Sequence, residues 1–314
     1  MKKKMINTTH IEGVLYEHDL QLRETGPKSK NPGVKYISGS VSIATDDAMT
    51  NIVPVYFTYT TPTFGSGKTN DAFVTLNNII DGVYGTYMKD GADKAVKLKI
   101  DSAIGLNEFY TDRSGKEELV SAKRNEGGFV HKVEVLEEDE KIRNTFKVDM
   151  LITNVSMTEG DPEKNTVDKA IVKGAIFNFR NELLPIEFSA TNPNAMNYFL
   201  GLNASQKEPV FTCVWGRQIS EVVSRQIVTE SAFGEDEVRE VKNTRKDFVI
   251  TGAAKEPYIW DDESSITVAE LNEAIQKREI ALATLKQRQE EYKASRNAAP
   301  AVAANAPTQG GFNF

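Results

Sequence analysis

Apolar and polar residues alternate in short runs along most of the first 260 residues, a pattern that predicts β-strands. Val55 and Phe57 fall on one face of such a run, and Ile186 and Phe188 do the same in a later run. Helical spacing is confined to short stretches of this region and to one long segment near the C-terminus. The pattern therefore predicts a mainly β protein with few helices.

The same arrangement of runs occurs twice, about 135 residues apart. In each copy, a run with an internal glycine (Gly39 or Gly174) is followed by a polar turn and by a run that opens with a proline (Pro54 or Pro185). A glycine inside a strand marks a bulge or a tight barrel bend, and proline is tolerated at the start of a strand. The expected strands are 13–20, 36–43, 53–57, 96–100 and 129–135 in the first copy and 148–155, 171–177, 184–188, 210–215 and 248–252 in the second, with helices around 71–87 and 195–202.

Three strands, a helix and two strands follow one another in the order of an OB-fold, a five-stranded Greek-key barrel. We therefore expect two tandem OB-like modules, residues 1–140 and 141–260. The alternative is a pair of unrelated mixed α+β domains that share a hairpin by chance.

A C-terminal helix is predicted over residues 261–297. Thr267 and Glu270 have the spacing of a capping box, and Ile266 can pack on Leu271 as a hydrophobic staple. A heptad stripe follows, in which two of the eight positions are polar; its members are Val268, Leu271, Ile275, Arg278, Leu282, Leu285, Gln289 and Tyr292. The stripe suits either packing on the body or self-association through 268–296. Residues 298–314 are uncharged and rich in Ala, Pro, Asn and Gln, which predicts disorder.

Composition changes this picture in two respects. The single cysteine, Cys213, excludes a disulfide framework, and no apolar stretch reaches the roughly 20 residues that span a bilayer. The basic start at residues 2–4 lacks the apolar core of a signal peptide, so we expect a cytoplasmic protein. The net charge of −7 lacks the basic footprint of most nucleic-acid binders, and any phosphate-binding surface must be a local cluster.

Candidate chemistry of the enzymatic kind is weak. Residues 65–69 read Gly-Ser-Gly-Lys-Thr, but a phosphate-binding loop needs a glycine where Pro62 stands. One cysteine and three widely spaced histidines do not form a zinc set. Cys213 lies in an apolar run, as a buried and inert cysteine does. We expect no enzyme, no metal and no cofactor.

Aromatic residues interleaved with cations on strands remain the most informative pattern. Single strands bind where bases stack on rings and cations follow the backbone. Each module also carries a basic cluster just before its expected last strand, at 123–124 and at 245–246. The same residues are also compatible with a core and a solvated surface. The candidate nucleic-acid-binding residues are Lys35, Tyr56, Lys123, Arg124, Phe177, Phe179, Arg180, Trp215, Arg217, Arg245 and Lys246.

The stretches 36–45, 53–61, 122–130 and 173–179 resemble those of single-stranded-DNA-binding proteins from bacteriophages or mobile elements of Gram-positive hosts. The resemblance implies tandem OB-folds that coat single-stranded DNA during replication or recombination. It also implies that the terminal aromatics Phe312 and Phe314 dock into replication or recombination proteins, although this tail lacks the expected acidic residues. The alternative function is that of a non-enzymatic structural or assembly protein of a virion or complex.

Overall fold

The computed structural model describes residues 4–27, 29–112, 115–161, 166–229, 233, 237–262 and 265–298. Within these ranges, residues 221–229, 237–238, 240–245 and 295–298 are described by their backbone alone.

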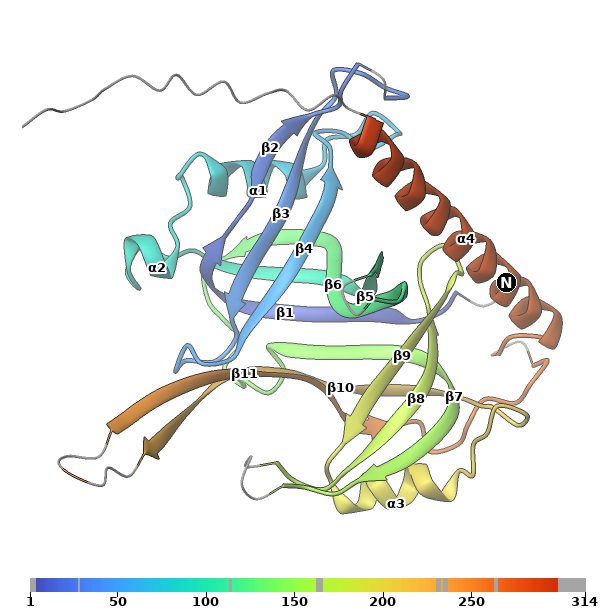
Figure 1. Cartoon of the computed structure of the whole chain (residues 1–314). Coiled ribbons are helices and arrows are strands. Elements are labelled where there is room, and N and C mark those ends of the chain that lie inside the picture. Colours follow the sequence, from blue (N-terminus) through green and yellow to red (C-terminus); the bar gives the residue numbers. More distant parts are fainter. Residues whose placement is uncertain are drawn as a thin grey trace, which may run out of the picture.

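The first half of the chain folds into a closed five-stranded barrel (Figure 1). Neighbouring strands pair in the order β1, β3, β4, β6, β5 and back to β1, and the β4–β6 pair alone is parallel. Helices α1 and α2 lie between β4 and β5 in the sequence, and the short β2 extends the sheet beside β3. The elements are β1 (Asn7–His18), β2 (Gln21–Glu24), β3 (Lys35–Ala44), β4 (Ile52–Thr60), α1 (Asp71–Ile80), α2 (Tyr87–Asp90), β5 (Lys97–Thr111) and β6 (Glu118–Val133).

The second half repeats this barrel. Its strands pair in the order β7, β8, β9, β11, β10 and back to β7, again with one parallel pair, β9–β11. The elements are β7 (Asn144–Thr158), β8 (Lys169–Phe177), β9 (Leu183–Ala190), α3 (Pro193–Gly201), β10 (Val210–Thr229) and β11 (Glu237–Ala253). The predicted mainly β fold of two OB-like barrels with short inserted helices is confirmed.

Each barrel has its own apolar core, and the repeated glycines explain its curvature. Val55 and Phe57 are buried in the first core, and Ile186 and Phe188 in the second. A Cβ atom on Gly174 would lie 1.9 Å from the carbonyl oxygen of Leu151, so only glycine allows the two strands to approach this closely. The pairing register shifts beside Gly39 and beside Gly174, as expected for barrel bends.

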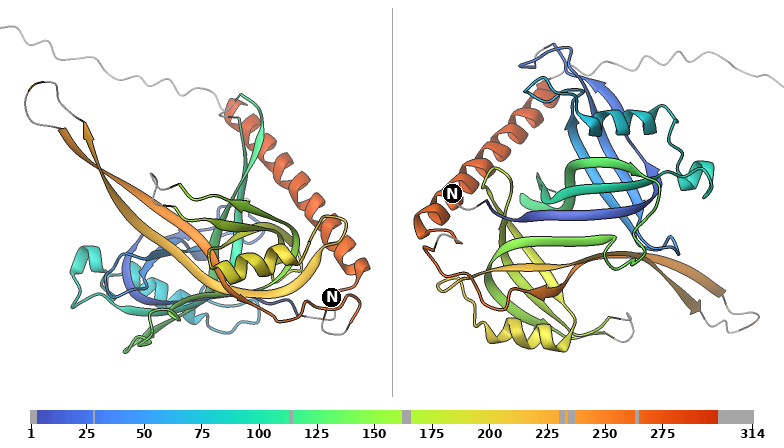
Figure 2. Two further views of the ribbon diagram at one scale, coloured as in Figure 1. Left: turned by 90° about the horizontal axis from the view of Figure 1, so that it is seen from below. Right: turned by 180° about the vertical axis from the view of Figure 1, so that it is seen from behind.

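The two barrels share one continuous sheet because β1 pairs antiparallel with β7. Asn7 to Ile11 lie opposite Val148 to Asn144, and Figure 2 shows the two strands side by side from behind. Among the residues that the structure describes, the sheet therefore contains 11 strands.

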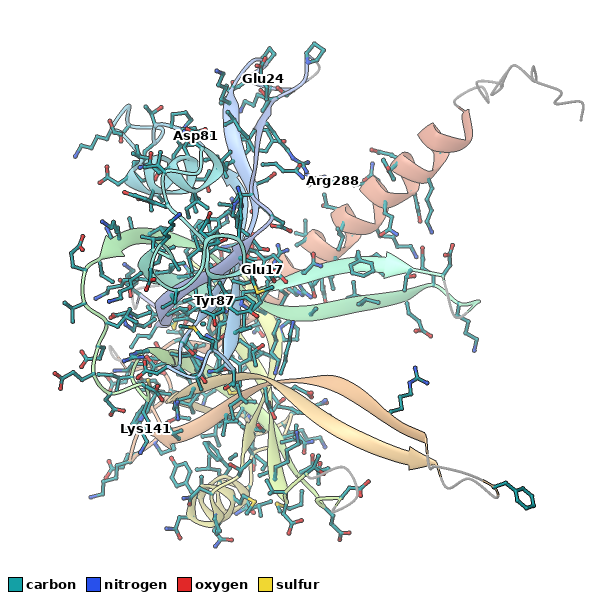
Figure 3. The ribbon with its side chains drawn as sticks, turned by 90° about the vertical axis from the view of Figure 1, so that its left-hand side faces the viewer. Glu17, Glu24, Asp81, Tyr87, Lys141 and Arg288 are labelled. Atoms are coloured by element: carbon teal, nitrogen blue, oxygen red, sulfur yellow. The ribbon has the colours of Figure 1, made fainter. Side chains whose placement is uncertain are left out.

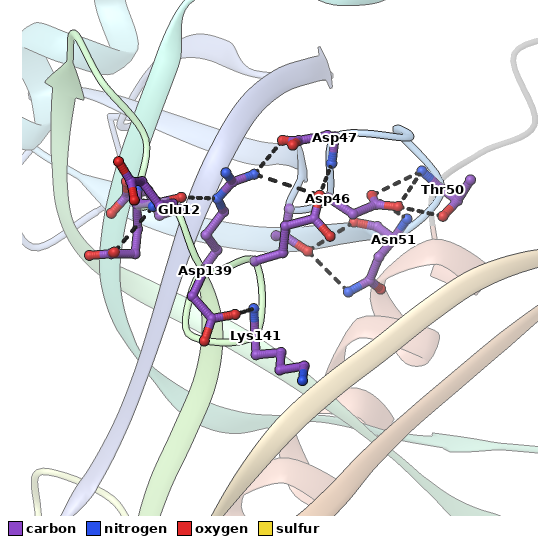
Figure 4. Close-up of polar contacts among 12 residues, drawn as sticks. Glu12, Asp46, Asp47, Thr50, Asn51, Asp139 and Lys141 are labelled. Carbon is purple, nitrogen blue, oxygen red and sulfur yellow. Dashed lines mark hydrogen bonds and ion pairs between the residues drawn. The ribbon is translucent and has the colours of Figure 1, made fainter.

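The segment that connects β6 to β7 is fixed to the first barrel by polar contacts (Figure 4). The nearly buried guanidinium of Arg143 donates to Asp47 over 2.6 Å and to the carbonyl of Glu137 over 2.5 Å. The carboxylate of Glu12 accepts a 2.6 Å hydrogen bond from the backbone N–H of Glu137. The connection is consequently a docked segment rather than a free linker between barrels.

Two long hairpins, β5–β6 and β10–β11, project from the same side of the molecule (Figure 3). The expected strands covered only the parts of these hairpins that contribute to the barrels. The sequence of the distal parts lacks a regular apolar alternation, as in Asn107-Glu108-Phe109-Tyr110 and Glu221-Val222-Val223-Ser224. As a result, the basic clusters at 123–124 and 245–246 lie within β6 and β11, and their expected position before the last strands is wrong.

Helix α4 (Val268–Ala298) begins at the predicted capping box. The backbone N–H of Glu270 donates to the Thr267 hydroxyl over 3.1 Å, and the N–H of Thr267 donates to the Glu270 carboxylate over 3.0 Å. Ile266 and Ala274 are buried against the second barrel, with Leu271 packed beside them. The heptad stripe is divided: five members are half-buried, whereas Val268, Ile275 and Tyr292 are exposed. Self-association through 268–296 stays a prediction. Helix α4 and the other described helices all lack the long apolar stretch needed to cross a membrane.

A pair of buried amides closes the junction between the barrels. Asn125 of β6 and Gln218 of β10 exchange two hydrogen bonds, of 2.8 and 3.0 Å. Asn51 and Asn144 both donate to the backbone carbonyl of Gln218. The side-chain amides of Asn125 and Gln218 are thus satisfied across the junction, so separating the barrels would leave buried polar groups unpaired.

We predict that Gln218→Ala and Asn125→Ala each lower the free energy of unfolding by about 1–3 kcal/mol, because each leaves a buried amide without its partner. The double variant should lose less than the sum of the two, since the second change removes a group that is already unpaired. Urea unfolding measures these energies, with Gln287→Ala on the exposed face of α4 as the control. Additive losses would contradict coupling across the junction.

Candidate nucleic-acid interface

A cleft of about 330 Å³ lies where β4 and β6 of the first barrel meet β10 and β11 of the second. A second hollow of about 280 Å³ continues it over the outer face of β3 and β4, and the two share Pro54, Tyr56, Ser220 and Lys246. We call them together the interbarrel groove. Four residues predicted to contact nucleic acid are brought together here: Tyr56, Lys123, Arg124 and Lys246.

Tyr56 presents its ring to the groove because alternation on β4 buries Val55 and Phe57 and turns Tyr56 outward. The guanidinium carbon of Arg124 lies 5.5 Å from the centroid of this ring. Glu126 accepts a 2.6 Å hydrogen bond from Arg124 and holds the guanidinium in place. A ring and a cation are therefore side by side on the first-barrel wall of the groove, an arrangement suited to a base and its phosphate.

Lys123 reaches from β6 of the first barrel to the second barrel. Its ammonium donates to the carbonyl of Glu187 over 2.5 Å and lies 5.7 Å from the ring centroid of Phe188 and 5.3 Å from that of Phe248. Burial lowers the pKa of Lys123, and the nearby carboxylates of Asp247 and Glu187 offset part of this effect. Lys123 thus contributes a weakly hydrated positive charge at the point where the two barrels touch.

Two further tyrosines on the same outer face escaped the sequence analysis. The rings of Tyr36 on β3 and Tyr59 on β4 lie 4.8 Å apart, and Tyr59 is 52% exposed. Simple alternation from Phe57 places Tyr59 inside the barrel. The register shift opposite Gly39 reverses the phase, because buried Ile37 pairs with Thr60. The internal Gly39 was the signal in the sequence: a bulge there shifts the pairing with β4 and so turns Tyr59 outward.

Cations outnumber carboxylates in the larger cleft of the groove, while Glu17 lines the smaller hollow. Lys123, Arg124 and Lys246 line the larger cleft beside one carboxylate, that of Asp247. Asp247 is itself 3.2 Å from the ammonium of Lys169. The whole chain, in contrast, carries a net charge of −7. Lys123, Arg124 and Lys246 thus form a local cluster of cations on a chain that is acidic as a whole.

The expectation for Phe177 is wrong. Its side chain is fully buried and packs edge-on against Phe211, with ring centroids 6.4 Å apart. Alternation placed Phe177 opposite the core residue Ile176, but both faces of β8 are buried here. Ile266 and Ala274, at the start of α4, cover the outer face. A ring enclosed in this way has no face for a base.

The remaining candidates lie outside the groove or beyond the described side chains. Phe179 and Arg180 sit at the β8–β9 turn, where the ring of Phe179 is 87% exposed and the guanidinium lies 5.1 Å from its centroid. Trp215 and Arg217 pair with Lys147 and Thr145 of β7, away from the groove. Lys35 opens β3 opposite Glu24. The side chain of Arg245 and the tail residues Phe312 and Phe314 lie outside the described residues.

The structure also locates the residues that were considered for metal, thiol and phosphate-loop sites in the described part of the chain. No group of three His, Cys, Asp or Glu side chains in these ranges is placed to hold a metal ion. Cys213 is buried. Residues 65–69 form a loop between β4 and α1, in which Thr63 and Thr69 pair as an isolated bridge.

The lowered pKa of Lys123 predicts a pH-dependent stability. The unfolded chain binds this proton more tightly than the folded chain, so the free energy of unfolding rises with pH between the lowered pKa and the ordinary value of 10.5. Lys123→Met removes the titrating group. We expect the wild-type protein to gain stability relative to Lys123→Met as the pH approaches 10.5, with Lys207→Met at an exposed lysine as the control. Urea unfolding at several pH values measures the difference, and a relative stability that falls with pH would contradict the assignment.

Comparison with known proteins supplies a family. A search of curated proteins finds no match. Among solved structures, a deletion mutant of the single-stranded DNA binding protein from Thermus aquaticus is similar, with 11% sequence identity, a TM-score of 0.45, and coverage of 82% of this chain and 97% of that chain. The model of the YorF family matches residues 5–288, which include both barrels and most of α4. The chain therefore belongs to the YorF family.

Proposed function

We propose that this protein binds single-stranded nucleic acid in the interbarrel groove, with single-stranded DNA as the first ligand to test. The observation that carries the proposal is the convergence of an outward tyrosine surface on β3–β4 with three cations on β6 and β11. OB-folds bind oligonucleotides on this face of the barrel and with the adjoining loops.

The geometry favours a single strand over a duplex. Bases can stack only when their faces are free. The groove offers the ring of Tyr56, and the Tyr36–Tyr59 pair extends the ring surface beyond it on β3–β4, rather than a broad basic surface. The three cations of the larger cleft match a few phosphates of one backbone. A duplex, whose bases are already stacked, would gain only the phosphate contacts and would bind more weakly.

The proposed role is a non-enzymatic one, the coating of single-stranded DNA during replication or recombination, as the sequence resemblance to phage proteins implies. Docking of replication or recombination proteins by the tail residues Phe312 and Phe314 is part of the same hypothesis. Its basis is the sequence alone.

We predict that Tyr56→Ala and Tyr59→Ala each weaken binding of a labelled oligo-dT of about 30 nucleotides by about 5- to 100-fold, since one stacking ring contributes about 1–3 kcal/mol. Fluorescence anisotropy measures the affinity. Phe179→Ala, which removes an exposed ring outside the groove, should leave it unchanged. Equal losses in all three variants, or no binding by the wild type at micromolar protein and low salt, would contradict the proposal. The second result would favour the structural or assembly role.

Lys246→Ala tests the phosphate contacts separately. Each phosphate neutralised on a single strand contributes about 0.7 to the slope of log K against log salt concentration. We expect this variant to reduce the slope by about that amount, while Lys207→Ala, at an exposed lysine elsewhere, leaves it unaltered. The measurement is a salt titration of the same anisotropy signal, and an unchanged slope for Lys246→Ala would remove this residue from the interface.

A further inference from the structure

The outer face of β8–β9 holds the position in the second barrel that the tyrosine-bearing face of β3–β4 holds in the first. A cleft of about 450 Å³ lies over it. Lys173, Pro185 and Glu187 form its floor, and Lys123 lines both this cleft and the interbarrel groove. The two surfaces are therefore continuous at Lys123.

Unlike its counterpart, this face is partly covered by other parts of the chain. The β5–β6 hairpin contributes one wall through Leu106, Glu108, Leu119 and Ser121, and α4 contributes Arg278. Figure 1 shows α4 running from the second barrel along that side of the molecule past the hairpin. Arg278 binds Glu108 with both terminal nitrogens, and the Tyr110 N–H donates to Gln289 over 2.9 Å.

The distal half of α4 is held to the hairpin by two ion pairs and by the two hydrogen bonds between Gln289 and the Tyr110 backbone. Lys286 lies 2.7 Å from Glu117, and Lys293 lies 3.4 Å from Asp112. These four side chains are between 35% and 73% exposed, and ion pairs of this kind contribute little and weaken with salt. Beyond Ala274, none of the described α4 side chains is fully buried. Leaving the hairpin would therefore expose parts of the half-buried Leu282 and Leu285 but no fully buried side chain, and the nearly buried Arg278–Glu108 pair is the strongest contact that must open.

We propose that the β8–β9 face is a second site for the same nucleic-acid strand, and that α4 must move off the hairpin to open it. The inference rests on the proposed function of the groove. A strand that passes Lys123 would meet Lys173 next. Its phosphates would replace Glu117 and Asp112 as partners of Lys286 and Lys293, so the helix would exchange one set of anions for another.

The test fixes α4 in place. In the variant Glu117→Cys/Lys286→Cys, a short bis-maleimide joins the helix to the hairpin, while native Cys213 is buried and protected from the reagent. Oligo-dT of about 12 nucleotides fits one barrel, whereas about 30 nucleotides exceeds it. We expect the cross-link to weaken binding of the longer oligonucleotide about 5- to 10-fold and to leave the shorter one unaffected. The control is the same variant capped on each cysteine by a monofunctional maleimide.

A second substitution checks that the additional affinity for the longer oligonucleotide arises on β8–β9. Lys173→Ala should weaken binding of the longer oligonucleotide about 3- to 10-fold in the capped protein and have no effect in the cross-linked protein, with Lys207→Ala as the matched control. If cross-linked and capped proteins bind both lengths equally, the second site is refuted while the groove stands. If neither length binds the capped protein, the proposed function itself fails.

Discussion

The antiparallel pairing of β1 with β7 is the constraint on which the rest of the structure depends. It joins two barrels into one sheet, and the register of this strand pair fixes their relative orientation. The docked connection around Arg143 and the amide pair Asn125–Gln218 then close the junction on polar contacts. The β1–β7 pairing thereby places the long hairpin of each barrel beside the outer face of the other barrel.

That fixed relation creates the groove. Residues of β10 and β11 stand beside the outer face of β3–β4, and residues of β5 and β6 stand beside that of β8–β9. The two faces differ in their chemistry. The first carries exposed tyrosines and stays open, whereas the second carries Lys173 and Glu187 and is walled by α4. The two equivalent faces therefore differ in exposure: the β3–β4 face is open, and the β8–β9 face is partly covered by the β5–β6 hairpin and α4.

The sequence predicted the parts of the fold that follow local rules. Gly39 and Gly174 marked the barrel bends, Thr267 and Glu270 marked the start of α4, and Val55 and Phe57 marked a core face. It did not predict the long hairpins, because their distal strands mix apolar and polar residues without a regular alternation. Nor did it predict that four distant candidates share one groove, since that depends on the β1–β7 register.

The errors at single residues have similar causes. Phe177 was expected at the surface because alternation cannot show that α4 covers the far side of β8. Tyr59 was missed because one register shift reverses the phase of a strand. Trp215 was a candidate because the cation Arg217 follows it on a strand, and the pairing of β10 with β7 places it away from the groove. Tertiary contacts, rather than residue type, decided each of these positions.

Photo-cross-linking of an oligo-dT that contains iododeoxyuridine, with the adducts located by mass spectrometry, tests the central claim most directly. This base couples to aromatic rings on which it stacks. The account predicts adducts at Tyr36, Tyr56 and Tyr59, which all lie on the outer face of β3–β4. Adducts confined to the exposed rings of Phe129, Phe179 or Trp215 would contradict it and move the nucleic-acid interface to another face of the molecule.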